Sequence, residues 1–201
     1  DPAMTREAVV QVYVARAYSW RGYFGVHSWI AVKPTAGRAF TVYEVIGWHA
    51  HHGGGPALVI DRNIPDRRWF GAAPKVIADL RGPGVDDVIK RIDAAARRYP
   101  FADDYVLWPG PNSNTFTAYI GRAGPKLNID LPPTAIGKDF LTNGSIFAAS
   151  PSRTGYQVSL YGLLGVLAGV EEGLEVNLFG LTFGIDAKDL ALKLPMAGRV
   201  G

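Results

Sequence analysis

Three side chains in this sequence could together perform nucleophilic catalysis: a serine, a histidine and a glutamate. Ser113 lies in a turn of two prolines, a glycine and small polar residues (residues 108–116), at the start of a helix expected over residues 115–122. The first turn of a helix has free backbone N–H groups, which can stabilise a developing oxyanion. A serine nucleophile also needs a base within hydrogen-bonding reach and a group that orients this base. His27 and Glu44 are the candidates for these two roles.

Two neighbouring strands and one helix would have to bring these side chains together. His27 lies in a run of β-branched and aromatic residues at 26–33, and Glu44 lies in a second run at 39–48. The turn between the runs is short, which predicts an antiparallel hairpin. Adjacent strands bring side chains of one face close together, and a helix packed on the sheet would bring Ser113 to His27.

Each of these residues also has an ordinary structural explanation. Serine and asparagine are common helix caps and turn residues, so Asn112, Ser113 and Asn114 could simply start the helix. The alternative for the two asparagines is an oxyanion-binding or positioning role. His27 could be a packed histidine beside a tryptophan, and Glu44 a strand residue that faces solvent. Spacing alone favours these structural explanations.

The remaining pattern predicts an α+β fold in which helices pack on an antiparallel sheet. Further strands are expected at residues 9–15, 57–60 and 105–108, and further helices at residues 75–80 and 85–99. Residues 156–194 are apolar with regularly spaced glycines, which predicts short strands and turns of a second antiparallel sheet. We therefore expect a core at residues 9–125 and a β-rich extension at residues 126–201 packed on the same domain. Residues 1–8 are expected to be a cloning remnant and a lead-in.

Composition excludes several classes of site and partner. The net charge is +3 and the basic residues are scattered, so no nucleic-acid partner is expected. The absence of cysteine excludes disulfides, thiolate metal sites and a cysteine nucleophile. His49, His51 and His52 invite a metal interpretation, but no clear acidic partner is close and a solvated glycine-rich loop explains them better. No metal and no cofactor are expected.

Other residues are candidates for lining a substrate pocket. Trp29 lies beside the candidate base, and Lys138 and Asp139 lie in an ordered-looking loop, where they could instead form an ordinary ion pair. The aromatic loop at residues 17–25 could hold an acyl chain or a sugar, or could cover the core of the sheet. The apolar stretch at residues 160–183 is expected to be chiefly core, although an exposed part would suit a membrane surface.

Two short motifs carry a resemblance to known hydrolases. The run Val26–Val32, followed far downstream by Asn112–Phe116, resembles the circularly permuted papain-like hydrolases of the NlpC-type superfamily, with the PPPDE peptidases and the lecithin:retinol acyltransferases among its relatives. In that superfamily a histidine on a strand comes first, and a nucleophile at a helix start comes later. The resemblance implies that His27, Glu44 and Ser113 form a catalytic triad in a permuted papain-like core. It covers roughly residues 9–125.

The whole chain also resembles a family of uncharacterised bacterial proteins. The shared segments are Gly-Pro-Asn-Ser-Asn-Thr-Phe at residues 110–116 and Leu-Pro-Pro-Thr-Ala-Ile-Gly-Lys-Asp at residues 131–139. This resemblance implies a protein of the bacterial cell envelope that faces the periplasm. It also implies membrane association through an N-terminal segment absent from this chain.

Serine stands where the papain-like nucleophile is cysteine. A serine hydroxyl cannot be held as a stable anion and depends on its base during attack, so the exchange often means weak or lost catalysis. It could also be an engineered replacement. The expected function is a serine hydrolase or acyltransferase that acts on an amide or ester of a small-molecule, lipid or peptidoglycan-type substrate. The alternative is a catalytically silent envelope protein that uses the cleft to bind a ligand or partner.

Overall fold

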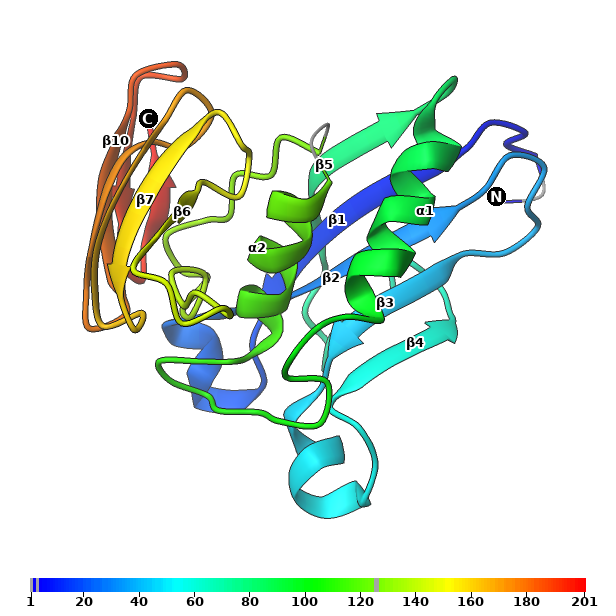
Figure 1. Cartoon of the computed structure of the whole chain (residues 1–201), viewed down its shortest axis with the longest axis horizontal. Coiled ribbons are helices and arrows are strands. Elements are labelled where there is room, and N and C mark those ends of the chain that lie inside the picture. Colours follow the sequence, from blue (N-terminus) through cyan, green and yellow to red (C-terminus); the bar gives the residue numbers. More distant parts are fainter. Residues whose placement is uncertain (1, 3, 125–126) are drawn as a thin grey trace.

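The computed structural model describes residues 2, 4–124 and 127–201 and shows a mixed α+β fold with two antiparallel sheets (Figure 1). Within these residues, the first sheet has five strands in the order β4-β3-β2-β1-β5. The bounds of these strands are β1 Val9–Arg16, β2 Val26–Lys33, β3 Thr41–Val45, β4 Leu58–Arg62 and β5 Lys75–Arg81. β2 and β3 pair antiparallel, as the short turn between them predicts.

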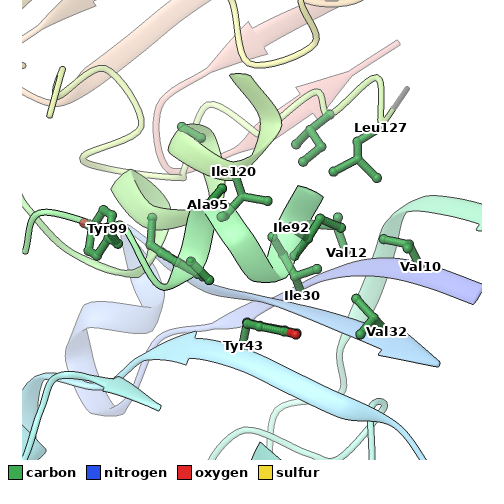
Figure 2. Close-up of a cluster of buried hydrophobic side chains, with 14 of the residues drawn as sticks. Val10, Val12, Ile30, Val32, Tyr43, Ile92, Ala95, Tyr99, Ile120 and Leu127 are labelled. Carbon is green, nitrogen blue, oxygen red and sulfur yellow. The ribbon is translucent and has the colours of Figure 1, made fainter. Parts of the chain in front are cut away.

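Two helices cover one face of the first sheet. α1 spans Val85–Ala96, and its apolar residues at helical spacing face the sheet. α2 spans Ser113–Ala123, and its Phe116 and Ile120 are fully buried. Figure 2 shows part of this core, in which Ile92 and Ile120 lie with Val10, Val12, Ile30 and Val32 of the central strands. The packing fixes α2 against β2, the strand that carries His27.

A second, smaller core covers the opposite face of the first sheet. Trp29 is fully buried there with Val42 and Trp69, and Trp69 belongs to the irregular segment at residues 63–73. The Trp29 indole N–H donates to the carbonyl of Pro65 at 2.8 Å. His27 lies on this face because side chains two residues apart on a strand point the same way.

The second sheet is a simple meander that lies beside α2 (Figure 1). Within the described residues its strands are β6 Phe147–Ala149, β7 Gly155–Leu160, β8 Leu164–Gly169, β9 Gly173–Leu178, β10 Leu181–Asp186, β11 Ala191–Leu194 and β12 Gly198–Val200. Arg122 of α2 connects the sheet to the core, because its guanidinium donates to the Ala149 carbonyl and to the Gln157 side chain.

The expectation that residues 160–183 are chiefly core is wrong. The polar side chains of this sheet point inward, where Glu175 forms ion pairs with Lys138 and Lys193. The large apolar side chains point outward and are exposed; they include Tyr156, Val158, Leu160, Leu164, Val166, Leu174, Val176, Leu178, Leu181, Phe183 and Ile185. The short strands of a second antiparallel sheet were predicted correctly, but the apolar pattern does not specify which face is buried.

Two local expectations are also wrong. Residues 75–81 form β5 instead of a short helix, because they pair antiparallel with β1 along the sheet edge. Residues 105–108 form a loop instead of a strand, and the Val106 N–H donates to the carbonyl of Pro111 within the same turn. Two short helical turns complete the described elements: η1 at Ser19–Tyr23 and η2 at His49–Gly53. None of the described helices combines the length and apolar character needed to cross a bilayer.

Candidate active site

A buried histidine and a buried glutamate are hydrogen-bonded on adjacent strands. Glu44 on β3 lies opposite Trp29 on β2, so its side chain shares a face with His27. The His27 Nε2 atom lies 3.3 Å from the Glu44 Oε2 atom, and the two residues are only 7% and 3% exposed. This contact brings together two of the three residues that the sequence selects for catalysis.

Arg67 holds the other oxygen of this carboxylate. Its guanidinium donates to Glu44 Oε1 and lies 5.3 Å from the ring centre of Trp29 and 5.9 Å from that of Trp69. Trp69 also stacks on the His27 imidazole, with 3.7 Å between ring centres and 11° between the planes. The segment at residues 63–73 therefore fixes both the glutamate and the histidine.

This environment sets the protonation of the pair. Burial lowers the pKa of His27 and the nearby Arg67 cation adds to this, although Glu44 opposes it. Burial alone would raise the pKa of Glu44, but hydrogen bonding and charge from His27 and Arg67 outweigh it and lower that pKa. An ionised carboxylate only accepts hydrogen bonds, so the Nε2 atom of a neutral His27 must donate to it. The Nδ1 atom is then left unprotonated and can act as a base.

Ser113 is the first residue of α2, where Asn112 caps the helix. The Asn112 Oδ1 atom accepts the backbone N–H groups of Asn114 at 2.9 Å and Thr115 at 3.1 Å. The Ser113 carbonyl accepts the Ser28 hydroxyl at 3.2 Å, which joins the helix start to β2 one residue from His27. The capping that sequence statistics favour for these residues is therefore present, and it places Ser113 beside β2.

Both asparagine side chains use their N–H₂ groups in this anchoring, whereas the Asn114 Oδ1 atom is buried without a hydrogen-bond partner among the described residues. The Asn112 amide donates to the carbonyls of Leu107 and Ile136, and the Asn114 amide donates to those of Val26 and Ile136. Each amide thus uses both of its N–H groups on the chain itself. By contrast, neither the N–H nor the Oγ atom of Ser113 makes a hydrogen bond to another described residue. The available oxyanion donor at this position is the Ser113 backbone N–H.

Ser113 and His27 line one cavity of about 620 Å³. It opens where β3 leaves β2, because the pairing of these strands ends at Trp29 and Glu44. Four of the five tryptophans of the chain line this cavity: Trp20, Trp48, Trp69 and Trp108. The cavity is also lined by Arg21, His51 and His52, and by no aspartate or glutamate among the described residues. Its wall is thus aromatic and carries only neutral or basic side chains.

Three residues expected as pocket candidates lie elsewhere. Trp29 is buried behind the cavity and contacts Arg67 instead. Lys138 and Asp139 lie under the second sheet, where the Lys138 ammonium donates to Glu175 at 2.5 Å and to the Leu131 carbonyl. Burial raises the pKa of Asp139 to about 6, even though Lys138 opposes it. None of these three residues lines the cavity.

Sequence reasoning selected the aromatic loop with Trp20, but it did not select Arg67, nor Trp48, Trp69 and Trp108 as residues of the cavity wall. Arg67 was only one of two adjacent arginines in a segment without periodicity, and no spacing relates it to Glu44. A buried carboxylate needs a cation, so a buried position for Glu44 would have been the signal to seek one. The described residues contain no group of three or more His, Cys, Asp or Glu side chains placed to hold a metal ion.

Comparison with known families gives one match. Residues 7–140 match a family described as a protein of unknown function, DUF3750. The chain belongs to this family. His27, Glu44, Arg67 and Ser113 all lie within the matched segment, and the second sheet lies beyond it. Neither curated proteins nor solved structures gave a match. The expectation of an uncharacterised family is confirmed, and the family description adds no activity.

Proposed function

We propose that this protein is a serine hydrolase or acyltransferase that acts on an ester or amide. The observation that carries the proposal is the buried hydrogen bond between Glu44 and His27, because His27 lines the same cavity as Ser113. Ser113 would be the nucleophile, His27 the base and Glu44 the group that orients it. A carboxylate held by Arg67 on one side and an imidazole stacked on Trp69 form a preorganised base, which a solvated histidine would not provide.

The chemistry follows from the tautomer of His27. The Ser113 Oγ atom attacks the carbonyl carbon of the substrate while its proton moves to His27 Nδ1. The Ser113 backbone N–H donates to the oxyanion, and Glu44 stabilises the imidazolium through Nε2. The intermediate then collapses, and His27 returns the proton to the departing alcohol or amine. Water completes a hydrolysis, whereas a second hydroxyl or amine completes an acyl transfer.

We place the active site in a permuted papain-like arrangement. The supporting features are the chain order of His27, Glu44 and Ser113, the strand position of the first two and the helix start at Ser113. The departure from that pattern is the serine, which needs its base during attack. The pairing of His27 with an ionised Glu44 supports a base of this kind.

We further propose a substrate of the cell envelope, either a lipid or a peptidoglycan-type molecule. The aromatic wall of the cavity supports it, because aromatic rings hold both acyl chains and sugars. The resemblance to envelope proteins supports a full-length protein that is membrane-associated and faces the periplasm. Cell fractionation tests this location: a full-length protein found in the cytosolic fraction after gentle lysis would contradict it.

The activity is tested with a panel of aryl esters, phospholipids and muropeptides. The wild type should turn over at least one class, and Ser113→Ala and His27→Ala should each lower kcat/KM by at least about 10²-fold. Ser145→Ala is the matched control, because this serine lies outside the cavity and should leave the rate unchanged. Turnover that survives Ser113→Ala would remove this serine from the mechanism.

A second candidate function is ligand binding without catalysis. It is favoured by one observation: the Ser113 hydroxyl makes no hydrogen bond to His27 or to any other described residue. Quenching of tryptophan fluorescence would report such binding, since the tryptophans surround the cavity. A molecule that quenches the fluorescence saturably but is not turned over would support this candidate over the enzyme.

A further inference from the structure

The outer face of the second sheet has the composition of a protein interior. Every outward position of β7, β8, β9 and β10 is apolar or aromatic, and all of these residues are exposed. Cross-strand pairing aligns Val158, Val166, Val176 and Phe183 in one row through the middle of this face. The face points away from α2 and from the rest of the molecule (Figure 1). No charged side chain interrupts it on these four strands.

The size of this face is near the upper limit of what monomeric proteins usually expose. The seven strands have three to six residues each, and at about 4.8 Å between strands and about 3.4 Å per residue they cover roughly 550 Å². This is close to the upper end of the largest apolar patch on a typical monomer, about 300–600 Å². Two such faces in contact would bury about 1,100 Å² in total, above the roughly 1,000 Å² expected of a specific interface. The area is therefore sufficient for a stable pair.

We propose that this face is the interface of a homodimer, in which the outer faces of two copies pack together as a β-sandwich. Packed sheets lie about 10 Å apart, and their cores are built from alternating apolar residues of this kind. A two-fold axis requires a self-complementary surface, and a uniformly apolar face meets this requirement without charge matching. Homodimer interfaces are also more apolar than transient ones.

Two observations favour a face-to-face copy over other occupants. The edge strands β6 and β12 have only three residues each, which disfavours pairing of two sheets edge to edge. Charges at the rim neutralise each other, since Lys188 pairs with Glu171 and Arg199 pairs with Asp189. Surfaces that bind anionic lipid usually add free basic residues to their apolar part. The paired rim therefore favours a second copy over a membrane.

The test is sedimentation of the whole chain over a range of concentrations. The wild type should sediment as two chains of 21.7 kDa each, and its melting temperature should rise with protein concentration. Val176→Lys, in the central strand, should shift the dissociation constant at least about 100-fold towards the monomer, because it buries an unpaired charge. Ile64→Lys is the matched control; Ile64 is exposed on the loop between β4 and β5 of the first sheet, and its substitution should leave the dimer intact.

The outcomes separate the possible occupants. A wild type that remains monomeric at about 100 μM, with a melting temperature independent of concentration, would overturn the proposal. So would a monomer that floats with vesicles of phosphatidylcholine and phosphatidylglycerol, because the face would then bind lipid. Higher aggregates without a dimer would also overturn it. If Val176→Lys fails to fold, the concentration dependence of the wild type still decides.

Discussion

Replacing Glu44 by glutamine should disable the base through its tautomer. The Arg67 guanidinium can only donate, so it retains the side-chain oxygen of the glutamine. The amide N–H₂ group then faces His27 Nε2, where it can only donate. The proton of the imidazole moves to Nδ1, and the atom that should accept the serine proton is lost. The wrong tautomer of a catalytic histidine costs up to about 10⁴-fold in rate, so we expect a loss of about 10²- to 10⁴-fold.

The same substitution should also lower stability, contrary to what the sequence alone suggests. A strand residue that faces solvent could be changed with little effect, but Glu44 is buried and paired with Arg67. Breaking a fully buried pair costs about 3–5 kcal/mol, and the Arg67 side chain is 20% exposed, so about 1–3 kcal/mol is expected. For a chain of this length each kcal/mol shifts the melting temperature by about 2–4 °C.

Arg67→Met provides the matched comparison. It removes the same ion pair and should lower the melting temperature by a similar amount, but it leaves the hydrogen bond between Glu44 and His27. Its rate should therefore fall much less than that of Glu44→Gln. The rate is measured as a single-turnover reaction with an activated ester, and the melting temperature of each variant is measured by differential scanning fluorimetry. The reasoning is refuted if Glu44→Gln reacts at the wild-type rate, or if Arg67→Met loses as much rate.

Three further predictions follow from the protonation and capping of buried groups. Because burial lowers the pKa of His27, the rate should fall with decreasing pH only below the ordinary histidine value of about 6.5, and a midpoint above 7 in the pH–rate profile would contradict this. Burial raises the pKa of Asp139 in the folded protein to about 6, against an ordinary value of 3.8, so stability falls as pH rises between these two values. Asp139→Asn should therefore stabilise the protein by up to about 3 kcal/mol at pH 8 and by almost nothing below pH 4, as measured by urea unfolding. Asn112→Ala removes the cap and should cost about 1–3 kcal/mol in the same assay, whereas Asn143→Ala in an exposed turn should cost less than about 0.5.

Local patterns predicted the first sheet and its helices because these elements are amphipathic in themselves. The alternation around His27 and the helical spacing from Val85 are short-range signals. The strand at residues 75–81 gave no such signal, since its conformation depends on pairing with β1, more than 60 residues away along the chain. Edge strands of this kind are defined by their neighbour more than by their own residues.

The site was predictable only in part for a related reason. Capping residues and a hairpin could be recognised at Asn112, His27 and Glu44 because their partners are near in sequence or on the next strand. Arg67 reaches Glu44 from an irregular loop, so only the fold reveals this contact. The second sheet shows the same limit, because the sequence specifies alternation and the tertiary structure decides which face meets the core.

The most direct test of the account is labelling with a fluorophosphonate, which reacts with an activated serine by forming a bond from Oγ to phosphorus and releasing fluoride. Peptide mass spectrometry should place the adduct on Ser113 in the wild type and in Ser145→Ala. His27→Ala should abolish the adduct while keeping a cooperative melting transition. A wild type that stays unlabelled, or an adduct that forms equally well without His27, would contradict the proposed Ser113–His27–Glu44 site.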